Sequence, residues 1–573
     1  MDSKSAASGL FCVFFGSWLR LGAFICFCAG LLWSAAFTEI CPAASENAVP
    51  PAYAPAPPEN IPMPAQSPDE APETAEFGFA DVEEAARALA EKPYLDSRYQ
   101  VPDFLLSITE AQWNNLGFNP EYTLWQNTGL PFEARFFHPG FIYNGMVSIE
   151  IVENGQSKKI PFSADMFNYD NPALAEQVRN AEVDFAGFSL SFPLHSDTYK
   201  DEIAVFLGAT YFRALGRHTG YGLAARGLAL NTGLAEEEFP YFRKFWLVKP
   251  EPDATSITVY ALMDSPGMTG AFHYVITPGT STVMDVSVNL FPRGDISRPL
   301  RLELAPISSM FLFSESGGAT PEDHRPEVHS SDGLLYTSED RWFWRPLSNP
   351  GRLAVNGFSL ANPRGFGLIQ RDDQFDHYQD TSSRFERRPS LWVEPSGAWG
   401  SGRLQLIEIP SSKEIHDNIL VFWTADNPGA EGASAQPSRS FAYKLYWMAP
   451  NTAPHTQGRV ADTRVQHLDD GITRFIIDFE SVYLNALPED TGLSSVIETP
   501  EGSPVLEKQL TKNPATGGWR LQFNVRLPKQ EGVIHNLLAT RENSTHARFS
   551  ALLKKGENLP DALTETWTYD APF

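Results

Sequence analysis

The sequence predicts a mainly β protein, in which a large antiparallel β-sandwich is followed by a small immunoglobulin-like β-sandwich. Apolar and polar residues alternate with a period of two along many short segments, and Gly- and Pro-containing turns separate these segments. At 573 residues the chain is also too long for one ordinary domain. These observations together favour two β domains of unequal size.

The first 41 residues are predicted to be an export signal. Lys4 and Arg20 precede an apolar run over 21–37, and small residues follow it. A membrane anchor is the alternative, although the run is at the short limit for spanning a bilayer. All four cysteines lie in this segment, at positions 12, 26, 28 and 41. Its removal would therefore leave an exported protein without thiols or disulfides.

Residues 42–76 form a predicted disordered spacer. They include ten prolines and six acidic residues but no Lys or Arg, so they cannot bury enough apolar surface to fold. The spacer carries −6 of the net charge of −26, which leaves −20 for the chain that follows. So acidic a protein is not expected to bind nucleic acid or an anionic membrane.

The large β-sandwich is predicted over residues 77–447. It should open with two short helices, one from Asp81 to Leu89 and one that begins at Ser107 or Thr109. Alternating segments at 147–151, 257–263 and 284–290 predict strands, and Asn154-Gly155 predicts a hairpin turn. One further helix is predicted near 201–215.

A Pro-, Thr- and Asn-rich linker at 448–458 marks the expected domain boundary. The residues that follow, 459–573, contain five predicted strands at 474–479, 505–511, 519–527, 547–553 and 565–569. Their number and spacing fit an immunoglobulin-like sandwich.

The chemistry-bearing residues favour a carbohydrate ligand. The sequence contains no phosphate-binding loop, dinucleotide fingerprint, HExxH motif or nucleophile elbow. Five of the thirteen tryptophans lie between residues 320 and 425, among many acidic residues. Aromatic rings can stack on the CH faces of sugars, and a carboxylic acid can protonate a glycosidic oxygen. The alternative is that these tryptophans are core residues and the acids are only solvated.

From Phe77 to about Tyr569 the chain resembles the periplasmic glucan biosynthesis protein G/D family. The runs that carry the resemblance include LGATYFRALG (207–216), YALMDSPGMTGAFHYVITPG (260–279), WFWRPLSNP (342–350), GFSLANPRGFGLIQR (357–371) and DNILVFW (417–423). The resemblance implies a periplasmic protein that acts on β-1,2-glucan, without a metal or other cofactor. It also implies a membrane-bound glucan synthase as a possible partner.

The resemblance places a general acid at Asp417. The general base expected in the family is replaced by Ser330, and the expected relay tyrosine by Phe385. Asp332, two residues after Ser330, is the candidate substitute base. A hydroxyl is a poor proton acceptor at neutral pH and a phenyl ring cannot relay a proton. Three hypotheses therefore stay open: glycosyl transfer, weak hydrolysis, and glucan binding without catalysis.

The remaining candidate residues would bind the sugar chain rather than transfer protons. Tryptophan side chains could serve as sugar platforms or as core, and Trp423 could also bury Asp417. Arginine side chains could clamp hydroxyls or pair with carboxylates. The candidates of both kinds are Trp342, Trp344, Trp392, Trp423, Arg345 and Arg388, together with Phe385.

Overall fold

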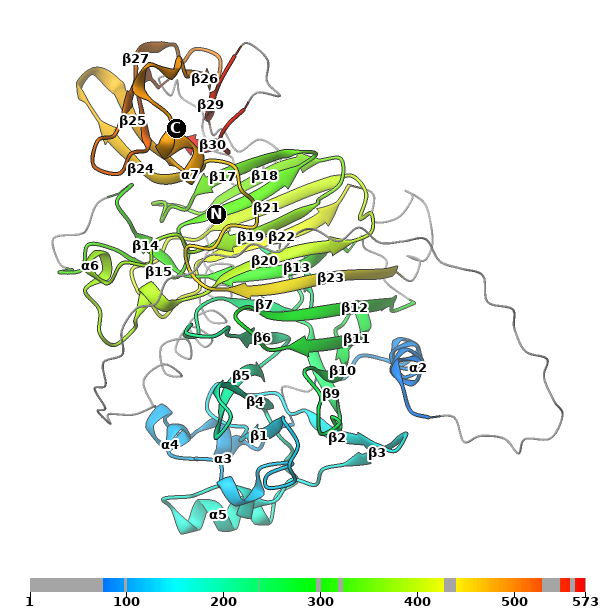
Figure 1. Ribbon diagram of the computed structural model, residues 1–573. Coiled ribbons are helices and arrows are strands. Elements are labelled where there is room, and N and C mark those ends of the chain that lie inside the picture. Colours follow the sequence, from blue (N-terminus) through cyan, green and yellow to red (C-terminus); the bar gives the residue numbers. More distant parts are fainter. Residues whose placement is uncertain are drawn as a thin grey trace, which may run out of the picture.

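The computed structural model describes residues 76–96, 100–234, 236–294, 300–317, 323–426, 439–527, 547–556 and 562–571. Within these ranges the protein is mainly β, which confirms the predicted fold class (Figure 1). The expected export signal and nearly all of the expected spacer lie outside the described residues. In the part of the chain that is described, no helix combines the length and apolar character needed to cross a membrane.

Two large sheets form the body of the molecule. The larger has 14 strands and is antiparallel except where β2 meets β9 and β17 meets β30. In spatial order its strands are β26 (Ser494–Glu498), β29 (Ala547–Lys554), β30 (Thr566–Ala571), β17 (Arg341–Pro346), β16 (Gly333–Ser338), β19 (Gly365–Ile369), β20 (Ser390–Ser396), β23 (Arg439–Met448), β12 (Thr282–Pro292), β11 (Met268–Thr277), β10 (Ile257–Asp264), β9 (Tyr241–Val248), β2 (Ser148–Glu153) and β3 (Gln156–Lys159).

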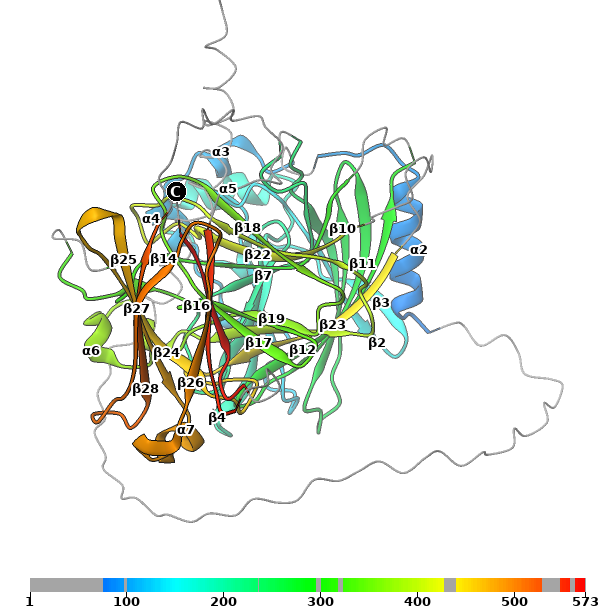
Figure 2. The same cartoon turned by 90° about the horizontal axis from the view of Figure 1, so that it is seen from above.

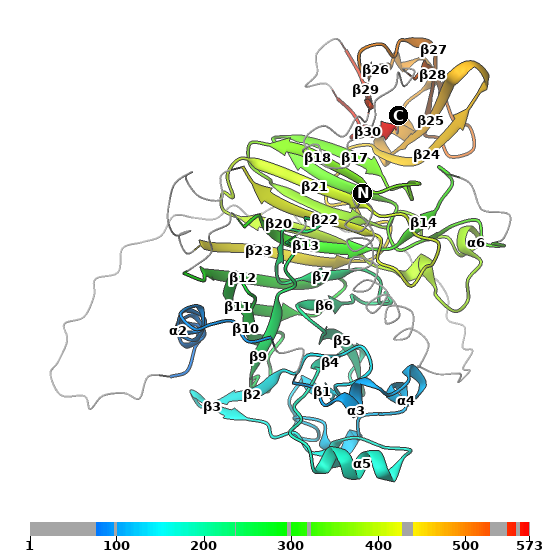
Figure 3. The ribbon, with the colours of Figure 1, turned by 180° about the vertical axis from the view of Figure 1, so that it is seen from behind.

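The second sheet has ten strands and is seen most clearly from behind (Figure 3). Its strands in spatial order are β1 (Glu133–Phe137), β4 (Gly187–Ser196), β5 (Tyr199–Leu207), β6 (Tyr211–Ala214), β7 (Ala224–Arg226), β13 (Leu302–Ser309), β22 (Ile419–Ala425), β21 (Gly402–Glu408) and β18 (Ala354–Leu360), with β8 (Ala229–Leu230) beside β13. A short hairpin of β14 (Phe311–Phe313) and β15 (Val328–His329) continues from the end of β13.

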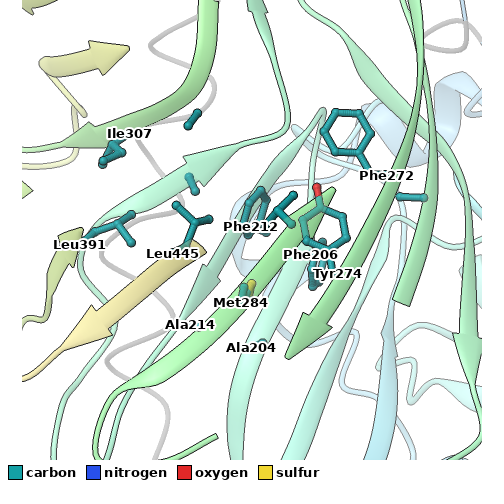
Figure 4. Close-up of a cluster of buried hydrophobic side chains, with 14 of the residues drawn as sticks. Ala204, Phe206, Phe212, Ala214, Phe272, Tyr274, Met284, Ile307, Leu391 and Leu445 are labelled. Atoms are coloured by element: carbon teal, nitrogen blue, oxygen red, sulfur yellow. The ribbon is translucent and has the colours of Figure 1, made fainter. Parts of the chain in front are cut away.

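The main hydrophobic core lies between these two sheets. Figure 4 shows part of it, where Phe206 and Phe212 from the ten-stranded sheet meet Tyr274 from the 14-stranded sheet. The rings of Phe206 and Phe212 stack with centroids 5.2 Å apart. Burying one such side chain stabilises the fold by about 1.5–3 kcal/mol, so this core fixes how the two sheets face each other.

The C-terminal part contains a four-stranded sheet that faces β26, β29 and β30. A second core joins them through Phe475, Phe523, Phe549 and Trp567. All five strands predicted after residue 458 are present; the immunoglobulin topology itself stays a prediction. The four-stranded sheet consists of β24 (Arg459–His467), β25 (Ile472–Glu480), β28 (Trp519–Arg526) and β27 (Val505–Lys512).

Helices are few and short. α2 (Phe79–Ala90) lies along β10, β11 and β12, as the view from above shows (Figure 2), and buries Val82 and Ala86 there. The hydroxyl of Thr109 caps α4 (Glu110–Asn114) as predicted. The others are α3 (Asp103–Leu106), α5 (Pro172–Arg179), α6 (Phe375–Tyr378) and α7 (Val482–Ala486), with 3₁₀ turns at Pro120–Tyr122, Ala164–Met166, Phe385–Arg387, Asp469–Gly471 and Glu489–Thr491.

The helix predicted near 201–215 is wrong. This segment forms β5 and β6, joined by a tight turn in which Gly208 and Ala209 have φ of 76° and 46°. Residues 203–207 are all buried because β5 is covered on both faces. A continuous apolar run of this kind does not distinguish a buried strand from a helix.

Candidate functional site

Asp417 lies directly before β22 and is held there by its neighbour Asn418. The Asn418 side chain accepts a hydrogen bond from the Phe311 N–H at 2.8 Å and donates to the carbonyls of Phe311 and Ile409 at 2.9 and 3.0 Å. These bonds tie the start of β22 to β14. Asp417 is 6% exposed, and its Oδ2 accepts a hydrogen bond of 3.2 Å from the Ser308 hydroxyl.

The surroundings of Asp417 favour a protonated carboxyl group. Its Oδ1 is buried and has no hydrogen-bond partner among the described residues. Burial raises the pKa of Asp417 above its ordinary value, although Arg213, Arg226 and Arg388 act in the opposite direction. A buried carboxyl whose pKa is raised, and whose second oxygen makes no hydrogen bond to the described residues, suits a proton donor.

Ser330 and Arg388 lie in the same region as Asp417. The Ser330 N–H donates to the Met310 carbonyl at 2.8 Å, so the β14–β15 hairpin places Ser330 just beyond the end of β13. The Arg388 guanidinium donates to the Ser330 hydroxyl and lies 4.2 Å from the centroid of the Phe385 ring. Because Arg388 also lowers the pKa of Asp417, it links the two candidate catalytic positions.

Asp332 belongs to a neighbouring cluster centred on His329. Its Oδ2 accepts hydrogen bonds from the N–H groups of Arg371 and Asp372, and its Oδ1 lies 3.5 Å from His329 Nε2. The same nitrogen lies 2.9 Å from Glu327. Burial lowers the pKa of His329, but the surrounding carboxylates outweigh this and raise it to about 9. His329 is therefore a cation at neutral pH, balanced by Asp332 and Glu327.

This cluster also contains potential metal ligands, which the sequence motifs did not indicate. Two sets of three residues each bring three possible ligand atoms, one per residue, within 4.8 Å of one another. The sets are Glu327, His329 and Asp332, and Glu327, Asp372 and His377. Imidazole and carboxylate groups could hold a divalent cation.

The candidate sugar platforms lie on opposite sides of the 14-stranded sheet, and Trp423 comes from β22 of the ten-stranded sheet. Trp423 is fully buried in the main core. Trp342, Trp344 and Trp392 lie on the opposite face, in or against the second core. Trp342 and Trp392 also line a cavity of about 710 Å³. Asp417 and Ser330 are not part of its lining, so they do not share this cavity with Trp342 and Trp392.

Arg345 has a structural position. Its guanidinium pairs with Glu408 at 3.0 Å and with Asp570 at 3.1 Å, and all three side chains are almost fully buried. Of the two predicted roles, pairing with carboxylates is the arrangement found. Trp344 is likewise buried, with the Arg371 guanidinium 3.4 Å from its ring centroid.

Several polar residues around Asp417 are not among the candidates predicted from the sequence. Tyr211 and Arg226 face each other across β6 and β7, with the guanidinium 4.5 Å from the ring centroid. The pKa of Glu237 is raised to about 7, mainly by burial. No local motif marks Ser308; only the pairing of β13 with β22 brings it to Asp417.

The fold and this site define a mainly β protein with buried carboxyl and arginine groups gathered where β13 ends and β22 begins. Comparison with known proteins places the chain in a family. The family model described as "Periplasmic glucan biosynthesis protein, MdoG" matches residues 77–571, and the chain belongs to this family.

Similar curated proteins carry corresponding names. "Glucans biosynthesis protein G" of Rhodopseudomonas palustris (strain BisA53) is 40% identical over 79% of this chain and 88% of its own length. The protein of the same name from Ralstonia nicotianae is 37% identical over 87% of this chain and 96% of its own. "Probable glucans biosynthesis protein D" of Shewanella oneidensis is 38% identical over 87% and 89%. These relatives confirm the resemblance seen in the sequence.

Proposed function

We propose that this protein takes part in periplasmic glucan biosynthesis and transfers glycosyl groups of a β-1,2-glucan backbone, with Asp417 as general acid. Membership of the family and the names of the relatives support the glucan as ligand and the periplasm as location. The observation that carries the catalytic part is the buried Asp417 carboxyl, whose pKa is raised and whose Oδ1 has no partner among the described residues.

In the proposed reaction Asp417 gives its proton to the glycosidic oxygen that leaves. The bond from that oxygen to the anomeric carbon breaks, while a hydroxyl of an acceptor sugar attacks the same carbon from the opposite face and inverts it. The acceptor hydroxyl loses its proton to a base. Ser330 is unsuited to this role because a neutral hydroxyl accepts protons weakly and this one already accepts a hydrogen bond from Arg388. Asp332, two residues further on, is the proposed base because its carboxylate accepts protons more readily than a hydroxyl. It can act only after a local shift that releases it from His329 or from the N–H groups of Arg371 and Asp372.

Transfer is proposed over hydrolysis because an acceptor sugar can be positioned by binding, whereas a water molecule depends more strongly on a well-placed base. The second candidate function is glucan binding without turnover, as an assembly factor for a membrane-bound glucan synthase. It is supported by the low exposure of Asp417 and Ser330, 6% and 1%, and by their absence from the lining of the open cavity at Trp342.

Product analysis after incubation with linear β-1,2-glucan tests the proposal. The wild-type protein should give new chain lengths or rings without a matching rise in reducing ends. Asp417→Asn should abolish these products, and the matched control Asp253→Asn, at an exposed carboxylate, should retain them. Unchanged product formation by Asp417→Asn would refute the assignment of the acid. Glucan binding by the wild type with no product at all would favour the assembly factor.

A further inference from the structure

The cavity at Trp342 and Trp392 lies apart from the proposed catalytic residues. It opens on the outer face of β17, β20 and β23, and its volume of about 710 Å³ is in the range of small-ligand sites. Along β20, Leu391 and Val393 point into the main core, and Trp392 between them points away from it. The 14-stranded sheet therefore separates the floor of this cavity from the main core.

We propose that this cavity is a second glucan-binding site, which holds a neutral sugar chain at a distance from Asp417. This inference rests on the proposed function for the identity of the sugar. Its own support is the combination of an aromatic platform with a polar rim, the arrangement that suits the CH faces and hydroxyl edges of pyranose rings.

The aromatic platform is held in place before any ligand binds. The rings of Trp342 and Trp392 lie 5.5 Å apart at an angle of 32°, and His455 packs on Trp342 with centroids 4.4 Å apart. His455 Nε2 is fixed by Glu565 at 2.7 Å. Gly365 lies under Trp392, where a Cβ atom would come within 2.2 Å of the indole. A rigid platform loses little conformational entropy when a ligand binds.

The rim supplies hydrogen-bonding groups with an excess of acid. The lining contains three carboxylates, those of Glu339, Asp340 and Glu394. It contains one cation, Arg364, which pairs with Asp340 at 3.1 Å. Burial, together with the charge and hydrogen bond of Glu394, raises the pKa of Tyr446 to about 12, so the hydroxyl keeps its proton and donates a hydrogen bond to the Glu394 carboxylate. An acidic rim of this kind repels anionic polymers and accepts hydrogen bonds from uncharged hydroxyls.

A site of this kind would hold a growing or acceptor chain while another part of it reacts. When one part of a glucan chain is bound at the first site, the rest of the same chain has a higher effective concentration at the second site, without any new contact there. We therefore expect long glucans to bind more tightly than short ones, and the gain to depend on Trp342.

The test is calorimetric titration of the purified protein with β-1,2-gluco-oligosaccharides and with an anionic polysaccharide of similar length. Trp342→Ala should weaken binding of the oligosaccharides about tenfold, a typical effect of losing one aromatic contact. Glu394→Ala removes an exposed rim group without touching either core and should also weaken binding. Asp253→Asn is the control for an unrelated surface change and should bind like the wild type.

The outcomes separate this site from the proposed reaction. Weak binding by Trp342→Ala and Glu394→Ala, with intact binding by Asp253→Asn, supports the second site even if no turnover is found. Unchanged glucan affinity in both Trp342→Ala and Glu394→Ala overturns the second site and leaves the proposed reaction at Asp417 unaffected. Equal binding of the anionic polysaccharide also overturns it, because the acidic rim would then have no effect. Absence of any glucan binding by the wild type overturns both proposals.

Discussion

Glu565 should be one of the most sensitive positions for stability. Its carboxylate is fully buried, receives hydrogen bonds from Arg371 at 2.6 and 3.0 Å and from the Val460 N–H at 2.9 Å, and also contacts His455. Glu565→Gln keeps the shape but removes the charge and turns one acceptor into a donor. The Arg371 guanidinium is then left buried without its counter-charge, which costs about 3–5 kcal/mol.

Urea unfolding at pH 7, followed by tryptophan fluorescence, measures this loss. With a slope of about 1–3 kcal/mol per molar urea, the midpoint should fall by roughly 1–5 M. Glu501→Gln, at an exposed position, is the matched control and should unfold like the wild type. Equal midpoints for Glu565→Gln and the wild type at pH 7 would refute the argument, because the buried pair would then contribute nothing net.

The pH dependence provides an independent check. Burial alone would raise the pKa of Glu565, but Arg371 and His455 outweigh it and the pKa is lowered. Its stabilising effect is therefore complete above the unfolded-state pKa of about 4.3 and is lost as the pH falls through the lower folded-state value. The difference between wild type and Glu565→Gln should shrink in that acidic range. A difference that grows on acidification would contradict this sign.

Three further predictions concern the site and the cavity. Glucan transfer should slow as the pH rises past the raised pKa of Asp417, and the descending limb of the rate profile should lie above the ordinary carboxyl pKa of about 3.9; a rate that rises steadily to pH 8 would contradict an acid role. Ser330→Asp should place a carboxylate beside Arg388 and raise reducing-end release at least about tenfold; no gain would argue that a missing base does not limit hydrolysis. Gly365→Ala should lower stability by about 1–3 kcal/mol and weaken glucan binding, because the new methyl group displaces Trp392. In the last case Gly351→Ala, where a Cβ atom meets nothing within 4 Å, is the control, and equal melting temperatures for the two variants would count against this packing.

The period-two patterns predicted most strands because those strands have one face in a core and one outside it. β28 is an example, with Trp519, Leu521 and Phe523 buried together. The prediction failed at β5, where both faces are covered and no alternation remains. Local patterns depend on one segment, whereas burial on two faces depends on segments that are far away in the sequence.

The site was predictable only where a motif marked it. Asp417, Ser330 and Phe385 were located through the matching runs. Ser308, which donates to Asp417, could not be found because its role follows from strand pairing across more than 100 positions. Alternation also failed to distinguish Trp342, which lines a cavity, from Trp423, which is core.

The parallel pairing of β30 with β17 has a consequence for the order of folding. Residues 566–571 complete a sheet whose neighbouring strand is at 341–346, so this contact can form only after more than 200 further residues have been synthesised. Until then β17 presents an unpaired edge, which is a surface that favours aggregation. Contacts this distant in sequence also slow folding. We therefore expect the newly made chain to depend on chaperones during the interval before β30 emerges.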